Sequence, residues 1–128
     1  MVWYLDTSAF LKLVALEDES PRLRAWFSSH EGIWSSQLLH TEAMRSAARL
    51  GIDAEVVEDA LEAVSLVLPS VTTYATAARL QPWTLRSLDA LHLATAMEIG
   101  DDLEGIVVYD ERLSEAARAA SLVVVAPR

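Results

Sequence analysis

Short apolar runs alternate with helical segments along this chain, and that alternation limits the folds that the chain can adopt. The runs VWYL, IWSS, SLVLP, GIVVY and LVVV have the length and the residue types of β-strands. Between them lie segments with a helical spacing of apolar residues and with capping residues or glycine at their ends. Strands that alternate with helices predict βαβ units. We therefore expect an α/β fold with three layers, α/β/α, around a mainly parallel sheet of about four to five strands.

The same signals place the expected elements on the sequence. Strands are expected at residues 2–5, 33–36, 65–69, 105–109 and 122–125. Helices are expected near residues 9–16, 20–30, 37–50, 53–64, 71–80, 87–99 and 111–120. The fourth helix is expected to turn Val56, Val57, Ala60, Leu61 and Val64 toward the core. No internal repeat or low-complexity segment interrupts the series, so a single domain spanning 1–128 is expected.

The composition is that of a protein with a packed core. Apolar residues make up 52% of the chain and charged residues 23%, which argues against disorder. No apolar run approaches the roughly 20 residues that cross a bilayer. The N-terminus reaches Asp6 without a basic region, so we do not expect a signal peptide. The absence of cysteine excludes a disulfide framework and a thiolate metal site, and it fits a reducing cytoplasm.

The net charge of −9 argues against a protein that binds nucleic acid through general charge attraction. Affinity for phosphates usually comes from lysine and arginine, whereas Lys12 is the only lysine here and the other cations are arginines. Two interpretations remain open. Either part of the acid belongs to a metal site, or the protein does not bind polyanions.

Two aspartates occupy equivalent places in the expected fold. Asp6 directly follows the first strand, and Asp110 directly follows the strand at 105–109. The carboxyl ends of parallel strands form the ligand crevice of an open α/β sheet, so both side chains are expected at the same edge. Each aspartate is equally well explained as the N-cap of the helix that follows it.

Two further acids lie within helices among apolar neighbours. Glu42 follows Leu38 and Leu39 by one turn, and Asp89 sits within the run SLDALHLATA. A buried carboxylate without a partner is costly and tends to take up a proton. Arg45 and Arg86, each three residues from one of these acids, are one possible compensation. A hard divalent cation such as Mg²⁺ or Mn²⁺ is the other.

Four segments of the chain resemble the PIN-domain family, and most closely its VapC-type toxins. They are YLDTSAFLKL, SSQLLHTEAMRSAAR, RSLDALHLATA and VVYDERLSEAAR, in the family's order and at its usual separations. The resemblance implies a PIN-like fold and an acidic quartet at Asp6, Glu42, Asp89 and Asp110. By this resemblance the quartet coordinates Mg²⁺ or Mn²⁺ and activates a water that hydrolyses a phosphodiester bond of RNA. A catalytically silent PIN module that only binds a partner is the alternative.

The resemblance also implies partners. A VapC-type toxin is an endoribonuclease that is inhibited by a cognate VapB-type antitoxin, whose basic C-terminal segment suits a chain of charge −9. A homodimer or a toxin–antitoxin hetero-oligomer is expected. DNA would be contacted only through the antitoxin, no membrane is involved, and the location would be the cytoplasm of a bacterium or archaeon.

The hydroxyl residues near the expected acids differ in part from the family's pattern. Many relatives place Thr or Ser two residues before the last aspartate, whereas this chain has Val108 there. That departure bears either on the affinity for a second metal ion or on the contribution of Asp110, which is the least certain of the four expected ligands. Thr7 and Ser8 are possible supports of the site, although capping of the first helix is the favoured role for both.

Four other residues are candidates of lower specificity. His92 is expected to be a packing residue rather than a catalytic one. Arg45 and Arg86 are expected either to contact RNA phosphate or to pair with Glu42 and Asp89. Trp83 follows a proline in a loop-like stretch, so it is a candidate for an exposed stacking or partner contact.

Overall fold

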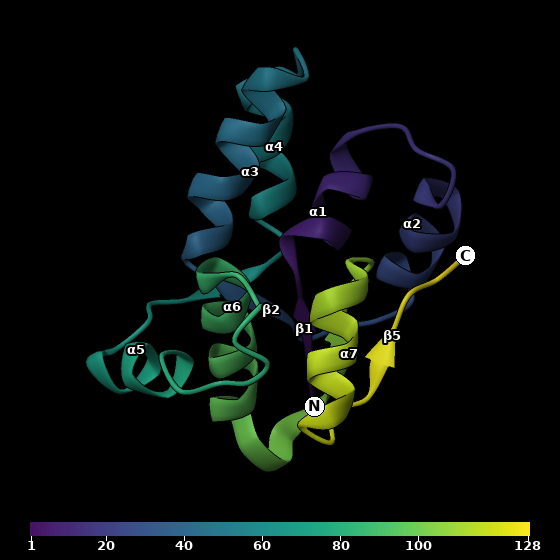
Figure 1. Cartoon of the computed structure of the whole chain (residues 1–128). Helices are drawn as coiled ribbons and strands as arrows, with labels where there is room; N and C mark the ends of the chain where they lie inside the picture. Colours follow the sequence, from purple (N-terminus) through teal and green to yellow (C-terminus); the bar gives the residue numbers. More distant parts are fainter.

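The centre of the molecule is a parallel sheet of five strands in the order β3-β2-β1-β4-β5. The computed structural model describes residues 1–128, and the chain runs through it as shown in Figure 1. The strands are β1 (Val2–Leu5), β2 (Ile33–Ser36), β3 (Ser65–Val67), β4 (Leu103–Val107) and β5 (Val124–Val125). Every neighbouring pair is parallel. Strand β1 lies in the middle, so the first residues of the chain form the centre of the sheet.

The helices cover both faces of the sheet. They are α1 (Thr7–Val14), α2 (Ser20–Ser28), α3 (Leu38–Arg49), α4 (Ala54–Leu61), α5 (Val71–Ala77), α6 (Ser87–Ile99) and α7 (Glu111–Ala119). A short 3₁₀ turn, Gly100–Asp102, leads from α6 into β4. In Figure 1, α1 to α4 occupy the upper half of the view and α5 to α7 the lower half. The expected three-layer α/β/α arrangement is therefore confirmed.

Alternation along the strands creates two separate cores. Leu5 and Val107 point to one face, where they pack with buried residues of α1 to α4. Tyr4 and Ile106, one position earlier on each strand, point to the other face and pack against α6 and α7. Successive side chains of a strand point to opposite faces, so β1 and β4 each contribute to both cores. The carboxyl ends of β1 and β4 are thereby fixed between two packed layers.

Helix α6 is buried on more than one side. Its residues Ala90 to Ala96 are all buried, because the sheet covers one side of the helix and α5 covers another. Small residues at this contact, Ala77 on α5 with Ala90 and Ala94 on α6, allow the two helices to approach closely. Asp89 precedes this buried stretch by one residue, so the packing of α6 determines where its carboxylate lies.

The structure corrects some of the expected details. Val56 is 47% exposed, because Val57 and Leu61 occupy the core side of α4 and Val56 lies beside that side. Strand β4 spans Leu103–Val107 rather than 105–109, because it pairs with β1, which ends at Leu5. Helix α5 ends at Ala77, before the expected residue 80. None of the helices has both the length and the apolar character needed to cross a membrane.

Candidate functional site

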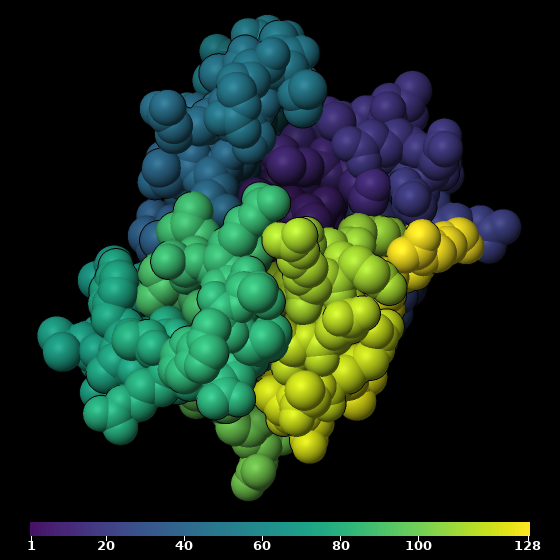
Figure 2. Space-filling model, in the orientation of Figure 1, coloured from purple at the N-terminus to yellow at the C-terminus, as the bar shows by residue number.

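One pocket brings together the four predicted acids. It has a volume of about 340 Å³ and is lined by Asp6, Thr7, Ser8, Glu42, Arg86, Ser87, Leu88, Asp89 and Asp110. Asp6 and Asp110 enter it from the carboxyl ends of β1 and β4, Glu42 from α3 and Asp89 from the first turn of α6. Figure 2 shows the purple N-terminal segment recessed between the blue α3 region and the green and yellow segments.

Asp6 is the most buried of the four acids, with 3% of its surface exposed. Its Oδ2 atom accepts a hydrogen bond from the amide of Ser8 at 3.1 Å and another from the Ser8 hydroxyl at 2.7 Å. Asp6 is therefore the N-cap of α1. Both bonds end on Oδ2, so Oδ1 is left for another partner. Capping and site formation, which the sequence presents as alternatives, are compatible in this side chain.

Asp110 repeats this arrangement at the end of β4. It is the N-cap of α7, and its Oδ1 atom accepts a hydrogen bond from the amide of Leu113 at 2.9 Å. Its side chain is exposed, unlike that of Asp6. Oδ2 is again left unbonded. The pocket therefore has one deeply placed aspartate and one at its rim.

The hydroxyl groups of Thr7 and Ser8 do not cap α1, contrary to the favoured expectation. The cap is Asp6, and the two hydroxyls bond to the acids instead. Thr7 Oγ1 donates to Glu42 Oε1 at 3.1 Å, and Ser8 Oγ donates to Asp6 Oδ2. Ser8 Oγ also accepts from the amide of Tyr109 at 3.0 Å, which ties the end of β4 to the start of α1.

Glu42 is held by a buried histidine. His92 Nε2 lies 2.6 Å from Glu42 Oε1, and His92 Nδ1 lies 2.6 Å from the phenolic oxygen of Tyr4. Burial on its own lowers the pKa of His92, but the hydrogen bond to Glu42 and the nearby charges of Asp6 and Asp89 outweigh it and raise the pKa. The expectation that His92 only packs is thus incomplete. Tyr4 was not anticipated, since nothing in the sequence marks its hydroxyl.

Asp89 has no hydrogen-bond or ion-pair partner within the chain. Burial is the largest cause that raises its pKa, and the negative charges of Asp6, Asp110 and Glu42 raise it further, to about 6, against a smaller opposing effect of His92. A carboxylate under this much repulsion is well suited to bind a cation.

The arginines near the pocket do not neutralise its acids. The only ion pairs in the chain join Lys12 to Glu17 and Glu19, and His92 to Glu42. Arg45 and Arg86 are exposed and form neither of the expected pairs with Glu42 and Asp89. Both guanidinium groups are therefore available to an anionic ligand, and Arg86 lines the pocket itself.

The donor set fits a hard divalent cation. The acids and hydroxyls of the pocket offer only oxygen atoms, which Mg²⁺ and Mn²⁺ prefer. No three acids or histidines lie close enough together to form a complete coordination shell. Mutual repulsion of the carboxylates favours such a spread arrangement, and a cation would reduce that repulsion.

Val108 does not line the pocket. It is fully buried and packs with Tyr4, Leu93 and Leu113 in the core below α6 and α7. The hydroxyl that connects this strand end with an acid of the pocket is that of Ser8, which donates to Asp6 and accepts from the amide of Tyr109.

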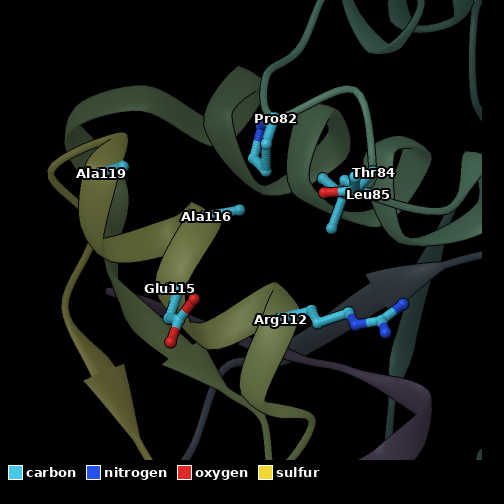
Figure 3. A pocket seen from close by; sticks show the side chains of 7 residues that line it. All are labelled: Pro82, Thr84, Leu85, Arg112, Glu115, Ala116 and Ala119. Carbon is cyan, nitrogen blue, oxygen red and sulfur yellow. The ribbon is translucent and has the colours of Figure 1, made fainter.

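A larger groove of about 720 Å³ lies between α7 and the loop before α6. Figure 3 shows Pro82, Thr84 and Leu85 on the loop side, facing Arg112, Glu115, Ala116 and Ala119 on α7. The loop that borders this groove ends at Arg86, which lines the acidic pocket. Trp83 is in the same loop and is 71% exposed, as the sequence suggested.

Comparison with known proteins identifies the family to which the chain belongs. The sequence profile of the PIN domain matches residues 3–119. The chain is 38% identical over 125 residues to Ribonuclease VapC46 of Mycobacterium tuberculosis, covering 97% of this chain and 96% of the relative. It is 41% identical over 134 residues to Ribonuclease VapC35 of the same organism, with the same coverage.

A solved structure shares the fold. The crystal structure of Mycobacterium tuberculosis VapC20, described as a Sarcin-Ricin loop cleaving toxin, superposes with a TM-score of 0.77 at 18% identity. The match covers 98% of this chain and 99% of that one. With the profile match and the full-length relatives, this chain belongs to the PIN-domain family, in its VapC branch.

Proposed function

We propose that the protein is a metal-dependent endoribonuclease, which hydrolyses RNA phosphodiester bonds as the toxin of a VapBC-type pair. The observation that carries this proposal is the pocket of four carboxylates that no lysine or arginine neutralises, in a chain related over nearly its whole length to VapC ribonucleases. Residues 1–128 would act as one PIN domain.

Asp6, Glu42, Asp89 and Asp110 would hold Mg²⁺ or Mn²⁺. The oxygens of these four residues that are free of protein hydrogen bonds are Asp6 Oδ1, Glu42 Oε2, Asp110 Oδ2 and both oxygens of Asp89. All four residues line the pocket. A bound divalent cation would lower the pKa of a water and neutralise charge that builds on the phosphate. Asp6 would contribute most, because it is buried and fixed by Ser8, and Asp110 least, because it is exposed.

The exposed arginines would supply the affinity for RNA that the net charge opposes. Arg86 would contact the RNA phosphate next to the one that is cleaved at the acidic pocket. Arg45 would contact a phosphate that lies along α3. Local arginines of this kind permit binding by a chain of charge −9, since contacts to phosphate act at short range.

The net charge of −9 also supports inhibition by a cationic segment of an antitoxin. That segment would lie across the acidic pocket. Leu68, in the loop before α5, and Val71 and Tyr74, on α5, are exposed apolar side chains that support assembly into a homodimer or a hetero-oligomer. As for a VapC-type toxin, the place of action would be the cytoplasm.

Asp6→Asn tests the proposal because asparagine keeps the N-cap of α1 but removes the charge. Purified protein with RNA and Mg²⁺ or Mn²⁺ should give cleavage that chelation stops and that Asp6→Asn abolishes. The control is Asp53→Asn, an exposed aspartate at the start of α4 outside the pocket. Cleavage that survives in Asp6→Asn would point to a contaminating nuclease. Divalent binding without any cleavage would favour the partner-binding module instead.

A further inference from the structure

A fully buried histidine lies behind the acidic pocket, and the proposed chemistry does not use it. His92 is 0% exposed and contacts Tyr4 on one side and Glu42 on the other, each at 2.6 Å. The contacts join residues 88 and 50 positions apart in the sequence. They therefore depend on the folded arrangement of β1, α3 and α6.

The direction of the hydrogen bond to Glu42 is fixed by the acceptor. An ionised carboxylate only accepts, so the Nε2 atom of His92 must carry the hydrogen that it donates. This holds for the neutral ring and for the imidazolium. Tyr4 adapts to both, because its hydroxyl donates to Nδ1 of the neutral ring or accepts from Nδ1 of the imidazolium. The Tyr4 ring also packs edge-on against the imidazole, with centroids 5.8 Å apart.

The two donors to Glu42 end on the same oxygen. His92 Nε2 and Thr7 Oγ1 both bond to Oε1, at 2.6 and 3.1 Å. Oε2 has no such partner, and Glu42 lines the pocket. A glutamate side chain loses substantial rotamer entropy when it is immobilised. Bonds that already hold it in place reduce the entropy that a cation must remove on binding.

We propose that His92 is a positioning residue that, supported by Tyr4, holds Glu42 with Oε2 directed toward the bound cation. The inference rests on the proposed metal site and goes beyond it, because it assigns a role to two residues that do not line the pocket. The alternative is that His92 fills space in the core and that its hydrogen bonds only satisfy buried polar atoms.

The affinity of the protein for Mn²⁺ distinguishes a positioning role of His92 from a space-filling role. It can be measured without RNA. Electron paramagnetic resonance of free Mn²⁺ gives the dissociation constant of the full-length protein, and Asp6→Asn gives the background from the acidic surface. Three variants are compared with the wild type. His92→Leu removes the hydrogen bonds of the imidazole to Tyr4 and Glu42 and its contact of 3.2 Å with Thr7 Oγ1. His92→Gln retains an amide donor for Glu42, and Tyr4→Phe removes only the hydroxyl.

Loss of a group that orients a metal ligand typically costs about 10- to 100-fold in metal affinity, and this loss is expected for His92→Leu. His92→Gln should recover most of that loss. Tyr4→Phe should weaken binding by about fivefold, the value of one ordinary hydrogen bond. Thermal unfolding of each variant, followed by circular dichroism, separates these effects from a loss of fold.

The outcomes distinguish this inference from the proposed function. Wild-type binding no tighter than that of Asp6→Asn would overturn the metal site and this inference with it. A wild type that binds Mn²⁺ specifically, with a folded His92→Leu that binds equally well, would overturn only the role of His92. If His92→Leu does not fold, Tyr4→Phe decides, and unchanged affinity in that variant contradicts the proposal.

Discussion

The hydroxyl of Ser8 donates a hydrogen bond of 2.7 Å to Oδ2 of Asp6. The Oγ atom of Ser8 also accepts a hydrogen bond from the amide of Tyr109, so the Ser8 side chain links the most buried acid of the pocket to the end of β4. The placement of Asp6 relative to Asp110, one residue beyond Tyr109, therefore depends on Ser8.

Ser8→Ala should destabilise the protein by about 1–3 kcal/mol, because it leaves the amide of Tyr109 without its partner in a partly buried place. Cleavage of RNA should fall as well, since Asp6 loses one of its two fixed contacts. Urea unfolding and initial rates measure the two effects. Ser28→Ala, at the end of α2, is a matched control that should change neither. Equal stability of Ser8→Ala and wild type would contradict the prediction.

The free energy of unfolding of the metal-free protein should fall as the pH rises, because of the raised pKa of Asp89. Its pKa is raised to about 6 in the folded state by burial and by Asp6 and Asp110, from the ordinary value of 3.8. The folded state therefore holds the proton more tightly. That stabilisation is fully present below about pH 4 and is lost as the pH rises through 6.

Asp89→Asn should consequently stabilise the metal-free protein at pH 7.5, by on the order of 1–2 kcal/mol once its contact with solvent is considered. At pH 4 the variant and the wild type should be nearly equal. Thermal unfolding in a chelator at both pH values is the measurement. Asp89→Asn should also lose RNA cleavage. If the variant is stabilised as much at pH 4 as at pH 7.5, the raised pKa of Asp89 is not the cause of the stabilisation.

Arg86→Gln should weaken RNA binding and leave the fold intact, because Arg86 is exposed and has no partner within the chain. Each lost phosphate contact on a single strand should lower the slope of log affinity against log salt by about 0.7. The change should appear mainly in KM. Arg79→Gln, an exposed arginine after α5 outside the pocket, is the control. Equal salt slopes for Arg86→Gln and Arg79→Gln would remove Arg86 from the RNA contact.

Gly105→Ala should destabilise the sheet without touching the pocket. A Cβ atom there would lie 2.8 Å from the carbonyl oxygen of Val123 and 2.9 Å from the ring of Trp3. Crowding of this kind costs about 1–3 kcal/mol, because β5 and Trp3 would have to move. Gly100→Ala is an informative comparison, since that glycine has open space and only its φ of +71° opposes a side chain. A melting temperature unchanged in Gly105→Ala would contradict the packing described.

The sequence contains enough information for the architecture and for half of the site. Asp6 and Asp110 follow strands, so the topology alone places them at one edge. Glu42 and Asp89 lie on helices, and their position in the pocket depends on how α3 and α6 pack, which spacing along the chain does not reveal. Only the resemblance to the PIN-domain family connected them with the first two.

Contacts between distant residues account for most of what could not be predicted. The hydrogen bonds from Tyr4 through His92 to Glu42 join β1, α6 and α3. In the sequence, His92 has the apolar neighbours expected of a residue that only packs in the core. Helix α6 is apolar on nearly every side because two layers cover it, so periodicity does not indicate which face meets the sheet. Thr7 and Ser8 have the residue types of helix caps, but Asp6 already occupies the cap position.

The order of the strands has a consequence for the moment at which activity arises in a growing chain. Strand β1 is synthesised well before its neighbour β4 and the aspartate that follows β4. A nascent chain that ends before β4 lacks both Asp110 and the strand that pairs with β1 beside Asp6. The four acids of the candidate site can therefore come together only after β4 and Asp110 have left the ribosome.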